Sequence, residues 1–294
     1  MTEPVLSVVV LAWDNLDLTR RFVRSVRDHT DVAYELIIVD NGSAAEAVAF
    51  ARDAADHAIL NAENLGFAAG MNQGLAAARG EWVAFCNNDT VLPAAWASRL
   101  VETGTEAPDA AIVVPAITAS RNPATVRSTP GDSVRTLAPF SPPPAAVLYL
   151  MRRADAVALG GWGEEYTVAS GEDVDLCFRV WVNDRDVVFD ERVLVDHVGH
   201  ATAERLPDSE ALWAANRRLF LDVWTGPTDP PRLAGCDPVR FARNRETARA
   251  VAGWMDQYFR ARDARRPGPS RSARRSPIRR MAGKVARALG LRRS

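Results

Sequence analysis

The feature that most constrains the fold of this chain is an alternation of apolar runs and helix-like segments over its first 86 residues. Runs typical of strands cover Val5 to Leu11, Glu35 to Val39, Ala58 to Leu60 and Trp82 to Cys86. Segments with helical spacing of apolar residues lie between them, at Leu16 to His29, Ala44 to Ala55 and Ala68 to Ala78. Strands that alternate with helices build parallel sheets. We therefore predict an α/β fold with a doubly wound, mostly parallel sheet and helices on both faces.

The chain beyond Pro93 is less regular. We predict helices over Ala94 to Thr103, Arg153 to Leu159, Asp173 to Asn183, Ser209 to Trp224 and Phe241 to Arg260. We predict strands over Ala111 to Val114, Val147 to Met151, Val187 to Phe189 and Val193 to Val195. A polar stretch from Thr118 to Ser141 leads into three prolines, Pro142 to Pro144. Long irregular segments in a compact domain are often lids or binding loops, so we expect this stretch to contact a substrate.

The length of 294 residues fits one large α/β domain with an extension. We predict a main domain over residues 1–228, a helical extension over 229–262 and a basic tail over 263–294. An apolar content of 47% allows a sizeable core.

The cysteines and the first residues indicate the compartment. Cys86, Cys177 and Cys236 are odd in number and form no CxxC pair, so neither a disulfide framework nor a zinc site is expected. The first apolar run lacks a basic region before it, and no stretch approaches the roughly 20 apolar residues that span a bilayer. We expect a cytoplasmic protein with reduced thiols.

The charge is unevenly distributed. From Arg260 to Ser294 there are 13 Lys or Arg and one acid, a net charge of +12, whereas the rest of the chain holds 23 basic and 36 acidic residues, a net of −13. Within this tail a helical apolar stripe is formed by Ile278, Met281, Ala282, Val285 and Leu289. A basic amphipathic helix suits an anionic membrane surface. Disorder or a nucleic-acid arm are the alternatives, and the lack of aromatic residues after Phe259 argues against nucleic acid.

Polar residues follow two of the predicted strands directly. Asp40 ends the second strand, and Asn87-Asn88-Asp89 ends the fourth. Open α/β sheets bind ligands at the carboxyl ends of their strands. A carboxylate there can hold Mg²⁺ or Mn²⁺ against a diphosphate, because these hard cations prefer oxygen ligands.

Two further motifs carry polar or small residues in a pattern. Asn64 to Gly74 places Gly66, Gly70 and Gly74 at four-residue spacing, which suits either close approach of a nucleotide or tight packing of a helix on the sheet. The run from Gly171 to Asp175 holds three acids within four residues. Acids at a helix start can cap it, but three exceed what a cap requires, so one of them is a candidate base.

The order and spacing of these motifs resemble the inverting family-two glycosyltransferases of the GT-A fold, especially their rhamnosyl- and galactofuranosyl-transferring branches. The resemblance covers roughly Leu6 to Trp224. Its markers are Val39 to Ser43, Asn64 to Gly74, Asn87 to Thr90, Gly171 to Leu176 and His197 to His200. It implies that the main domain is a GT-A glycosyltransferase domain.

The resemblance implies a nucleotide-sugar site. Its residues here are Leu11, Ala12, Trp13, Asp40, Asn64, Gly66, Asn72, Asn87, Asn88 and Asp89. In the family the carboxylate at the position of Asp40 accepts the imide N–H of uracil or thymine. The alternative for Asp40 is an Asx-turn that stabilises Asn41-Gly42.

The resemblance also implies a divalent metal, Mg²⁺ or Mn²⁺, held by Asp89 and His197. The chain departs from the common Asp-x-Asp pattern because Asn87 replaces the first carboxylate, and an amide adds no charge for the cation. A lone His such as His197 is more often structural when no resemblance supports it.

The resemblance implies roles at the acceptor as well. Asp173 matches the general base that deprotonates the acceptor hydroxyl in an inverting displacement. Glu172, Trp162 and Arg217 are expected to bind the acceptor. Trp162 is equally typical of a core residue, and Arg217 of a solvated helix face.

The expected activity is metal-dependent transfer of rhamnose or galactofuranose from a UDP- or dTDP-sugar to a cell-surface glycan or lipid-linked acceptor, as in cell-wall or polysaccharide biosynthesis. Peripheral attachment to the inner face of the membrane through the tail would suit such an acceptor. A sugar-1-phosphate nucleotidyltransferase is disfavoured because Lys284 is the only lysine, and no GxGxxG or GxxxxGK[ST] motif follows a strand. A catalytically silent scaffold that keeps the fold and binds a nucleotide-sugar, glycan or protein partner remains the alternative.

Overall fold

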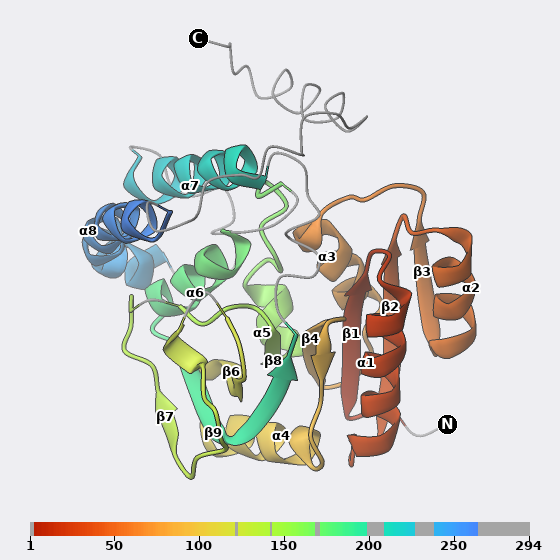
Figure 1. Ribbon diagram of the computed structural model, residues 1–294. Coiled ribbons are helices and arrows are strands. Elements are labelled where there is room, and N and C mark those ends of the chain that lie inside the picture. The colour runs from red at the N-terminus through yellow and green to blue at the C-terminus, as the bar shows by residue number, and fades with distance from the viewer. Residues whose placement is uncertain are drawn as a thin grey trace.

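The computed structural model describes residues 3–120, 123–141, 143–167, 171–198, 209–226 and 238–263. It contains a nine-stranded sheet (Figure 1). The strands are β1 (Leu6–Ala12), β2 (Tyr34–Asn41), β3 (His57–Asn61), β4 (Trp82–Asn87), β5 (Thr90–Val91), β6 (Ala110–Ile117), β7 (Val134–Thr136), β8 (Leu148–Arg152) and β9 (Asp186–His197).

The sheet is mostly parallel, as predicted. Its order is β3-β2-β1-β4-β8-β6-β9-β5, with β7 paired to β9 outside this path. The first four strands are parallel to one another, and so are β6 and β9. Strand β8 runs antiparallel to both of its neighbours, and the short strands β5 and β7 run antiparallel to β9. The predicted α/β architecture with a mostly parallel sheet is confirmed.

Helices cover both faces of the sheet. They are α1 (Leu16–His29), α2 (Ala45–Ala54), α3 (Phe67–Ala77), α4 (Trp96–Glu106), α5 (Arg153–Ala158), α6 (Glu172–Val182), α7 (Ser209–Thr225) and α8 (Pro238–Asp263), with one 3₁₀ turn, η1, at Pro123–Thr125. Alternate residues of β1 point to opposite faces, so Val8 and Val10 pack in one core with α1, α2 and α4, while Val9 packs in another with α3, α5 and α6. Figure 1 shows α7 and α8 stacked outside α6.

Helix α1 illustrates how local sequence produces this arrangement. Its apolar residues recur at helical spacing, and Phe22, Val23 and Val26 are buried against the sheet. Asp17 lies in the first turn and Arg27 in the last turn, which is the charge order that the helix dipole favours. The predicted bounds of this helix match those observed.

Three strands of the structure, β5, β7 and β9, differ from the prediction. The two strands expected at Val187–Phe189 and Val193–Val195 are one continuous strand, β9, with an irregular register opposite Pro115 and Ala116. The polar residues between them do not end the strand, because Asp190 is fully buried and accepts hydrogen bonds from Thr103 and Arg192. Strands β5 and β7 were not expected, since two- and three-residue strands have no readable periodicity.

The helical extension packs on the main domain. Ala248 and Ala252 of α8 are buried in the same core as Phe220 and Trp224 of α7. The division into residues 1–228, 229–262 and 263–294 stays a prediction, and the expected amphipathic helix of the tail lies outside the described residues. Among the helices that the structure describes, none combines the length and apolarity that crossing a bilayer requires.

Candidate functional site

The carboxyl ends of three neighbouring strands bring the predicted nucleotide residues together. In the register of β1 and β2, Ala12 is paired with Asp40, and in that of β1 and β4, Leu11 is paired with Asn87. Trp13 follows β1 directly and is half-buried. Parallel strands therefore place these residues at one edge of the sheet, as the sequence predicted.

Asp40 is fully buried, and only one of its two carboxylate oxygens has a hydrogen-bond partner among the described residues. Its Oδ1 accepts a hydrogen bond from the Ser43 amide, three residues on, at 3.0 Å. Asp40 thus stabilises the turn through Asn41-Gly42, although an Asx-turn would bind the amide two residues on. Its Oδ2 is buried and accepts no hydrogen bond from the described residues. An unpaired buried acceptor costs about 1–3 kcal/mol. A ligand N–H at this oxygen would remove that cost.

The loop after β1 is fixed to the loop after β2. The Asp14 amide donates to Ser43 Oγ at 2.8 Å, and the Ala44 amide donates to Asp14 Oδ1 at 3.0 Å. Asp14 and Asn15 both have φ of 50°, a conformation that Asp and Asn tolerate better than other residues with a side chain. Neither residue was predicted to belong to the site.

Two of the three spaced glycines serve packing. A Cβ on Gly70 would lie 2.3 Å from Leu11 Cδ1, and one on Gly74 would lie 2.2 Å from Val9 Cγ1. Both glycines thus let α3 approach β1 closely, which is the packing alternative for this motif. Gly66 precedes α3 with φ of 93°, and its carbonyl accepts a hydrogen bond from Asn41.

Asn64 and Asn72, the predicted ligand contacts of this motif, hold loops in place. Asn64 Oδ1 accepts hydrogen bonds from Asn41 Nδ2 at 2.8 Å and from the Gly66 amide at 2.9 Å. Asn72 donates to the Trp162 carbonyl at 2.9 Å and accepts from the Trp162 amide at 2.8 Å. A direct contact of either side chain with a nucleotide stays a prediction.

Asn41 organises the loop before α3, a role that the sequence did not reveal. It is 1% exposed. Its Oδ1 accepts hydrogen bonds from the Leu65 amide and from Asn61 Nδ2, and Asn61 in turn exchanges amide hydrogen bonds with Gln73 of α3. This buried amide network joins the ends of β2 and β3 to α3.

The predicted metal ligands, Asp89 and His197, lie together. His197 Nε2 is 3.3 Å from Asp89 Oδ1, and both side chains are less than a tenth exposed. Strand β5 begins at Thr90, directly after Asp89, and pairs with β9 so that Thr90 lies opposite His197. The Val198 amide donates to the Asp89 carbonyl at 3.0 Å. A short antiparallel pairing thus joins residues that are far apart in the chain.

The surroundings of His197 fix its orientation. Its Nδ1 lies 2.6 Å from the Ala119 carbonyl, which accepts only if Nδ1 carries the proton, so Nε2 faces Asp89. The His197 amide donates to Thr118 Oγ1 at 2.9 Å. Burial lowers the pKa of His197, but the hydrogen bond and charge of Asp89 outweigh it, so the pKa lies above its ordinary value. A proton and a cation would compete for Nε2.

This pair fits a divalent cation with a small number of protein ligands. An imidazole whose other nitrogen donates to a backbone carbonyl is the usual arrangement of a metal-binding His. Mg²⁺ is commonly bound by one or two carboxylates together with substrate phosphates. Within the described ranges, no three His, Cys, Asp or Glu side chains converge as a set that could hold a metal.

The two asparagines before Asp89 have different environments. Asn88 is 5% exposed and donates to Thr19 Oγ1 of α1 at 3.0 Å. Asn87 is half-buried, and its carbonyl accepts a hydrogen bond from Thr90 Oγ1. The side chain of Asn88 is thus hydrogen-bonded within the protein. A ligand role for either amide stays a prediction.

The acidic run begins α6. Asp173 is half-buried and accepts a hydrogen bond from the Val174 amide at 2.9 Å, whereas Glu172 is 5% exposed. Burial raises the pKa of Tyr149, and the charges of Cys177, Asp173 and Glu172 raise it further. The Tyr149 hydroxyl lies 3.6 Å from Cys177 Sγ of α6, and Tyr149 pairs with Phe85 of β4, so α6 packs beside the strand next to β4.

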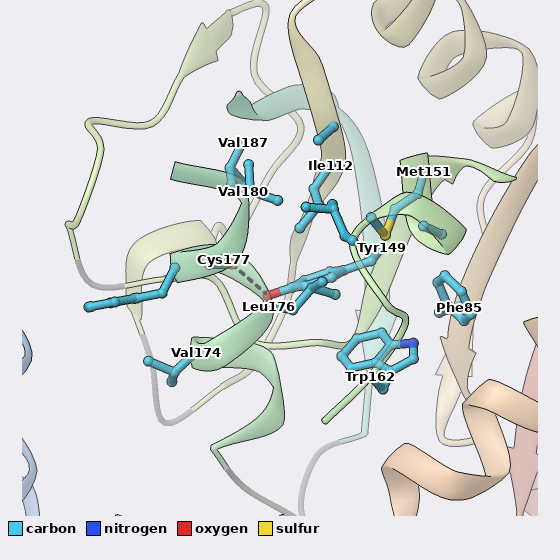
Figure 2. Packing of buried hydrophobic residues seen from close by; sticks show 14 of the residues in the cluster. Phe85, Ile112, Tyr149, Met151, Trp162, Val174, Leu176, Cys177, Val180 and Val187 are labelled. Atoms are coloured by element: carbon cyan, nitrogen blue, oxygen red, sulfur yellow. Dashed lines mark hydrogen bonds between the residues drawn. The ribbon is translucent and has the colours of Figure 1, made fainter. Parts of the chain in front are cut away.

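Trp162 lies in the core. It is 1% exposed, its ring contacts Phe67 and Phe85 edge to face at 5.1 and 5.4 Å, and it stacks on Tyr149 at 5.7 Å. Figure 2 shows it in the buried cluster with Tyr149 and Phe85. The core alternative therefore accounts for its position, and neither face of the ring is open to a sugar in this structure.

Arg217 is half-buried on α7. Its neighbour Asn216 is 3% exposed and donates to the Thr167 carbonyl at 3.0 Å. Helix α7 is thus fixed to the segment that precedes α6, and a role of Arg217 at the acceptor stays a prediction.

The chain is similar to known glycosyltransferases. Residues 7–142 match the family model described as Glycosyl transferase family 2. The pre-mycofactocin glycosyltransferase of Mycobacterium tuberculosis is 32% identical over 192 residues, which cover 60% of this chain and 38% of that protein. Across the curated relatives, the matches cover 34% to 38% of the relative's length.

Two solved structures share the fold. GalNAc-T7 with UDP, GalNAc and Mn²⁺ aligns with a TM-score of 0.60 at 15% identity, over 89% of this chain and 55% of that chain. TarS of S. aureus aligns with a TM-score of 0.59 at 15% identity, over 87% of this chain and 72% of that chain. The fold is therefore of the GT-A type, as predicted. Residues 7–142, slightly less than half of the chain, match glycosyltransferase family 2.

Proposed function

We propose that this protein is an inverting glycosyltransferase that moves a sugar from a nucleotide-sugar donor to a glycan or glycolipid acceptor. The observation that carries the proposal is the pair of Asp89 and His197, 3.3 Å apart at the sheet edge where Asp40 and Asn87 also lie. The family match and the relatives support sugar transfer.

The donor is a UDP- or dTDP-sugar. The buried Oδ2 of Asp40 suits the imide N–H that uracil and thymine share, and it has no hydrogen-bond partner among the described residues. The GalNAc-T7 structure, which contains UDP, supports a pyrimidine diphosphate donor. Rhamnose and galactofuranose are the favoured sugars because the motifs between Val39 and His200 resemble those of the rhamnosyl- and galactofuranosyl-transferring branches.

Mg²⁺ or Mn²⁺ would be held by Asp89 and His197, and the neighbour with Mn²⁺ supports this use of the fold. When bound, such a cation supplies charge that stabilises the departing diphosphate. Asp89 contributes the negative charge of this pair, and the Ala119 carbonyl keeps His197 Nε2 directed at Asp89.

Asp173 is the proposed general base. Its carboxylate takes the proton from the acceptor hydroxyl as the oxygen attacks the anomeric carbon on the side opposite the nucleotide, so one displacement inverts the configuration. Glu172 orients the acceptor, and Arg217 binds an anionic group of donor or acceptor. Trp162 has no part in this proposal because it is buried in the core.

The acceptor is a cell-surface glycan or a lipid-linked sugar, met at the cytoplasmic face of the membrane. The basic tail of residues 263–294 would hold the enzyme at an anionic lipid surface, since each Lys or Arg near such a surface contributes about 1 kcal/mol. Beyond Asp263 this tail lies outside the described residues, so its sequence alone supports the proposal.

A donor panel tests the proposal. Binding and hydrolysis of UDP-, dTDP- and GDP-sugars are measured with and without Mn²⁺ or Mg²⁺, for the wild type and for Asp173→Asn. The expected result is metal-dependent turnover of one donor, which Asp173→Asn abolishes without loss of binding. Donor binding without turnover would favour the silent scaffold, and binding of no donor would overturn the proposal.

A further inference from the structure

Helix α6 contains a buried ion pair two residues beyond the proposed base. Arg179 Nε donates to Asp175 Oδ2 at 2.8 Å, and the two side chains are 1% and 3% exposed. Asp175 is the third acid of the run that starts the helix, and nothing in the proposed chemistry uses it. Its side chain is buried in the protein. The side chain of Asp173, two residues earlier on the helix, projects in roughly the opposite direction.

Asp175 joins α6 to two other segments. Its Oδ1 accepts hydrogen bonds from Trp224 Nε1 of α7 at 2.9 Å and from the Tyr166 hydroxyl at 3.3 Å. With the guanidinium of Arg179 on Oδ2, three donors from three parts of the chain converge on one carboxylate. A charged acceptor makes the stronger kind of hydrogen bond, so this carboxylate fixes the orientation of α6.

Arg179 extends the connection to the loop after α5. Its Nη1 donates to the Leu159 carbonyl and, at 2.8 Å, to the Gly161 carbonyl. The next residue of that loop, Trp162, exchanges two hydrogen bonds with Asn72 of α3. The ion pair therefore connects the helix of the proposed base, through one loop, to the helix beside the proposed donor site.

The pair is not well explained as a source of stability. Buried ion pairs often contribute no more than apolar residues of the same size, because both charges lose their hydration. Arg179 Nη2 is buried and has no hydrogen-bond partner among the described residues, which adds to the cost. What the pair supplies instead is a fixed geometry for the first turn of α6.

We propose that Asp175 and Arg179 are positioning residues that hold the backbone of Asp173 where its carboxylate can act as the base. The inference rests on the proposed function, since it needs Asp173 to act on an acceptor hydroxyl. A displacement of about 1 Å at a reacting group can cost on the order of 100-fold in rate, so a small rotation of α6 has a large effect on kcat.

The test separates positioning from folding. Arg179→Lys keeps the charge but replaces the two guanidinium nitrogens, Nε on Asp175 and Nη1 on the loop carbonyls, with a single ammonium nitrogen. Tyr166→Phe removes a single hydroxyl donor to Asp175 and keeps the ring. The control is Glu35→Gln, which removes a buried charge that Ser7 and Arg79 bind at the other end of the parallel strands. For each, Tm, donor Kd, KM and kcat are measured with the donor that the wild type uses.

Arg179→Lys is expected to lower kcat by about 30- to 100-fold while donor Kd stays within about twofold, and Tyr166→Phe to lower kcat by about three- to tenfold. Glu35→Gln is expected to lower Tm without changing kcat by more than about threefold. The inference is overturned if the folded variants keep the kcat of the wild type, or if Kd rises as much as kcat falls. If Arg179→Lys does not fold, Tyr166→Phe decides. A wild type that turns over no donor overturns the proposed function as well.

Discussion

Nε2 of His197, at the end of β9, lies 3.3 Å from Oδ1 of Asp89, which follows β4. The Ala119 carbonyl accepts the Nδ1 proton at 2.6 Å, so the nitrogen that faces Asp89 is the one free to accept a proton or bind a cation. A carboxylate and a correctly oriented imidazole therefore face each other at the edge of the sheet where α/β proteins bind ligands.

Asp89→Asn and His197→Gln should each abolish metal-dependent donor binding. Each substitution removes one of two protein ligands, and loss of transition-state charge stabilisation should lower kcat by about 100- to 1,000-fold. Isothermal titration of Mn²⁺ with and without UDP measures the effect. His57→Gln, an exposed His on β3, is the control, and Mn²⁺ binding that survives both changes would place the cation elsewhere.

Thr118→Val should weaken Mn²⁺ binding without removing a ligand. Thr118 Oγ1 accepts the His197 N–H at 2.9 Å and donates to Asp196 at 2.9 Å, and Val has the same shape without the hydroxyl. Loss of a group that orients a metal ligand typically costs 10- to 100-fold in affinity, so a drop of about tenfold is expected. Thr118→Ser should restore the wild-type affinity, and an unchanged affinity in Thr118→Val would show that the strand pairing alone orients His197.

Asp40→Asn should weaken binding of UDP or dTDP by about tenfold or more, which is about 1.4 kcal/mol. The amide can still accept the Ser43 N–H on its oxygen, but it presents N–H groups where the base also donates. Asp56→Asn is the matched control, because Asp56 accepts a backbone N–H from Leu36 near the opposite end of β2. Equal affinities of the two variants would remove Asp40 from the base site.

Gly74→Ala should destabilise the protein more than Gly70→Ala. Ala gains about 1 kcal/mol of helix propensity over Gly, but overpacking costs about 1–3 kcal/mol. At Gly74 the new methyl meets a methyl of Val9, which is fully buried and rigid at χ1, whereas at Gly70 it meets the flexible end of Leu11. Urea unfolding measures both free energies. Movement of Leu11 in Gly70→Ala should also weaken nucleotide binding, whereas equal unfolding free energies would contradict the packing argument.

Glu35→Gln should destabilise the protein by about 1–3 kcal/mol at pH 7 and by less in acid. Burial raises the pKa of Glu35, but hydrogen bonds from Ser7 and Arg79 outweigh it, so the pKa lies below its ordinary value. A carboxylate with a lowered folded-state pKa stabilises the fold above its unfolded pKa, and this contribution disappears as the pH falls through the folded pKa. Urea unfolding from pH 7 to 3 should show the difference between wild type and variant shrinking below about pH 4.5. A difference independent of pH would show that the charge of Glu35 contributes nothing.

Much of the fold could be predicted because its information is local. The bounds of α1 and the start of α7 were predicted to the residue, since apolar residues at helical spacing mark one buried face. The order of strands and helices up to β4 followed in the same way, and with it the edge where Leu11, Asp40 and Asn87 meet. The length of β9 was not predictable, because the hydrogen bond from Thr103 that stabilises the buried Asp190 within the strand joins residues far apart in the chain.

The sequence by itself determined the elements, the faces that they bury and the polar residues at the strand ends, because these depend on periodicity within a few residues. Only the tertiary structure decided how the side chains pack. It gave the distance between His197 and Asp89, which the family resemblance had already assigned to one metal site. It also buried Trp162 between Phe67, Phe85 and Tyr149, and joined Asp175 to Arg179, Tyr166 and Trp224. Such contacts depend on strand pairing and helix packing between distant segments, which no local pattern of residues specifies.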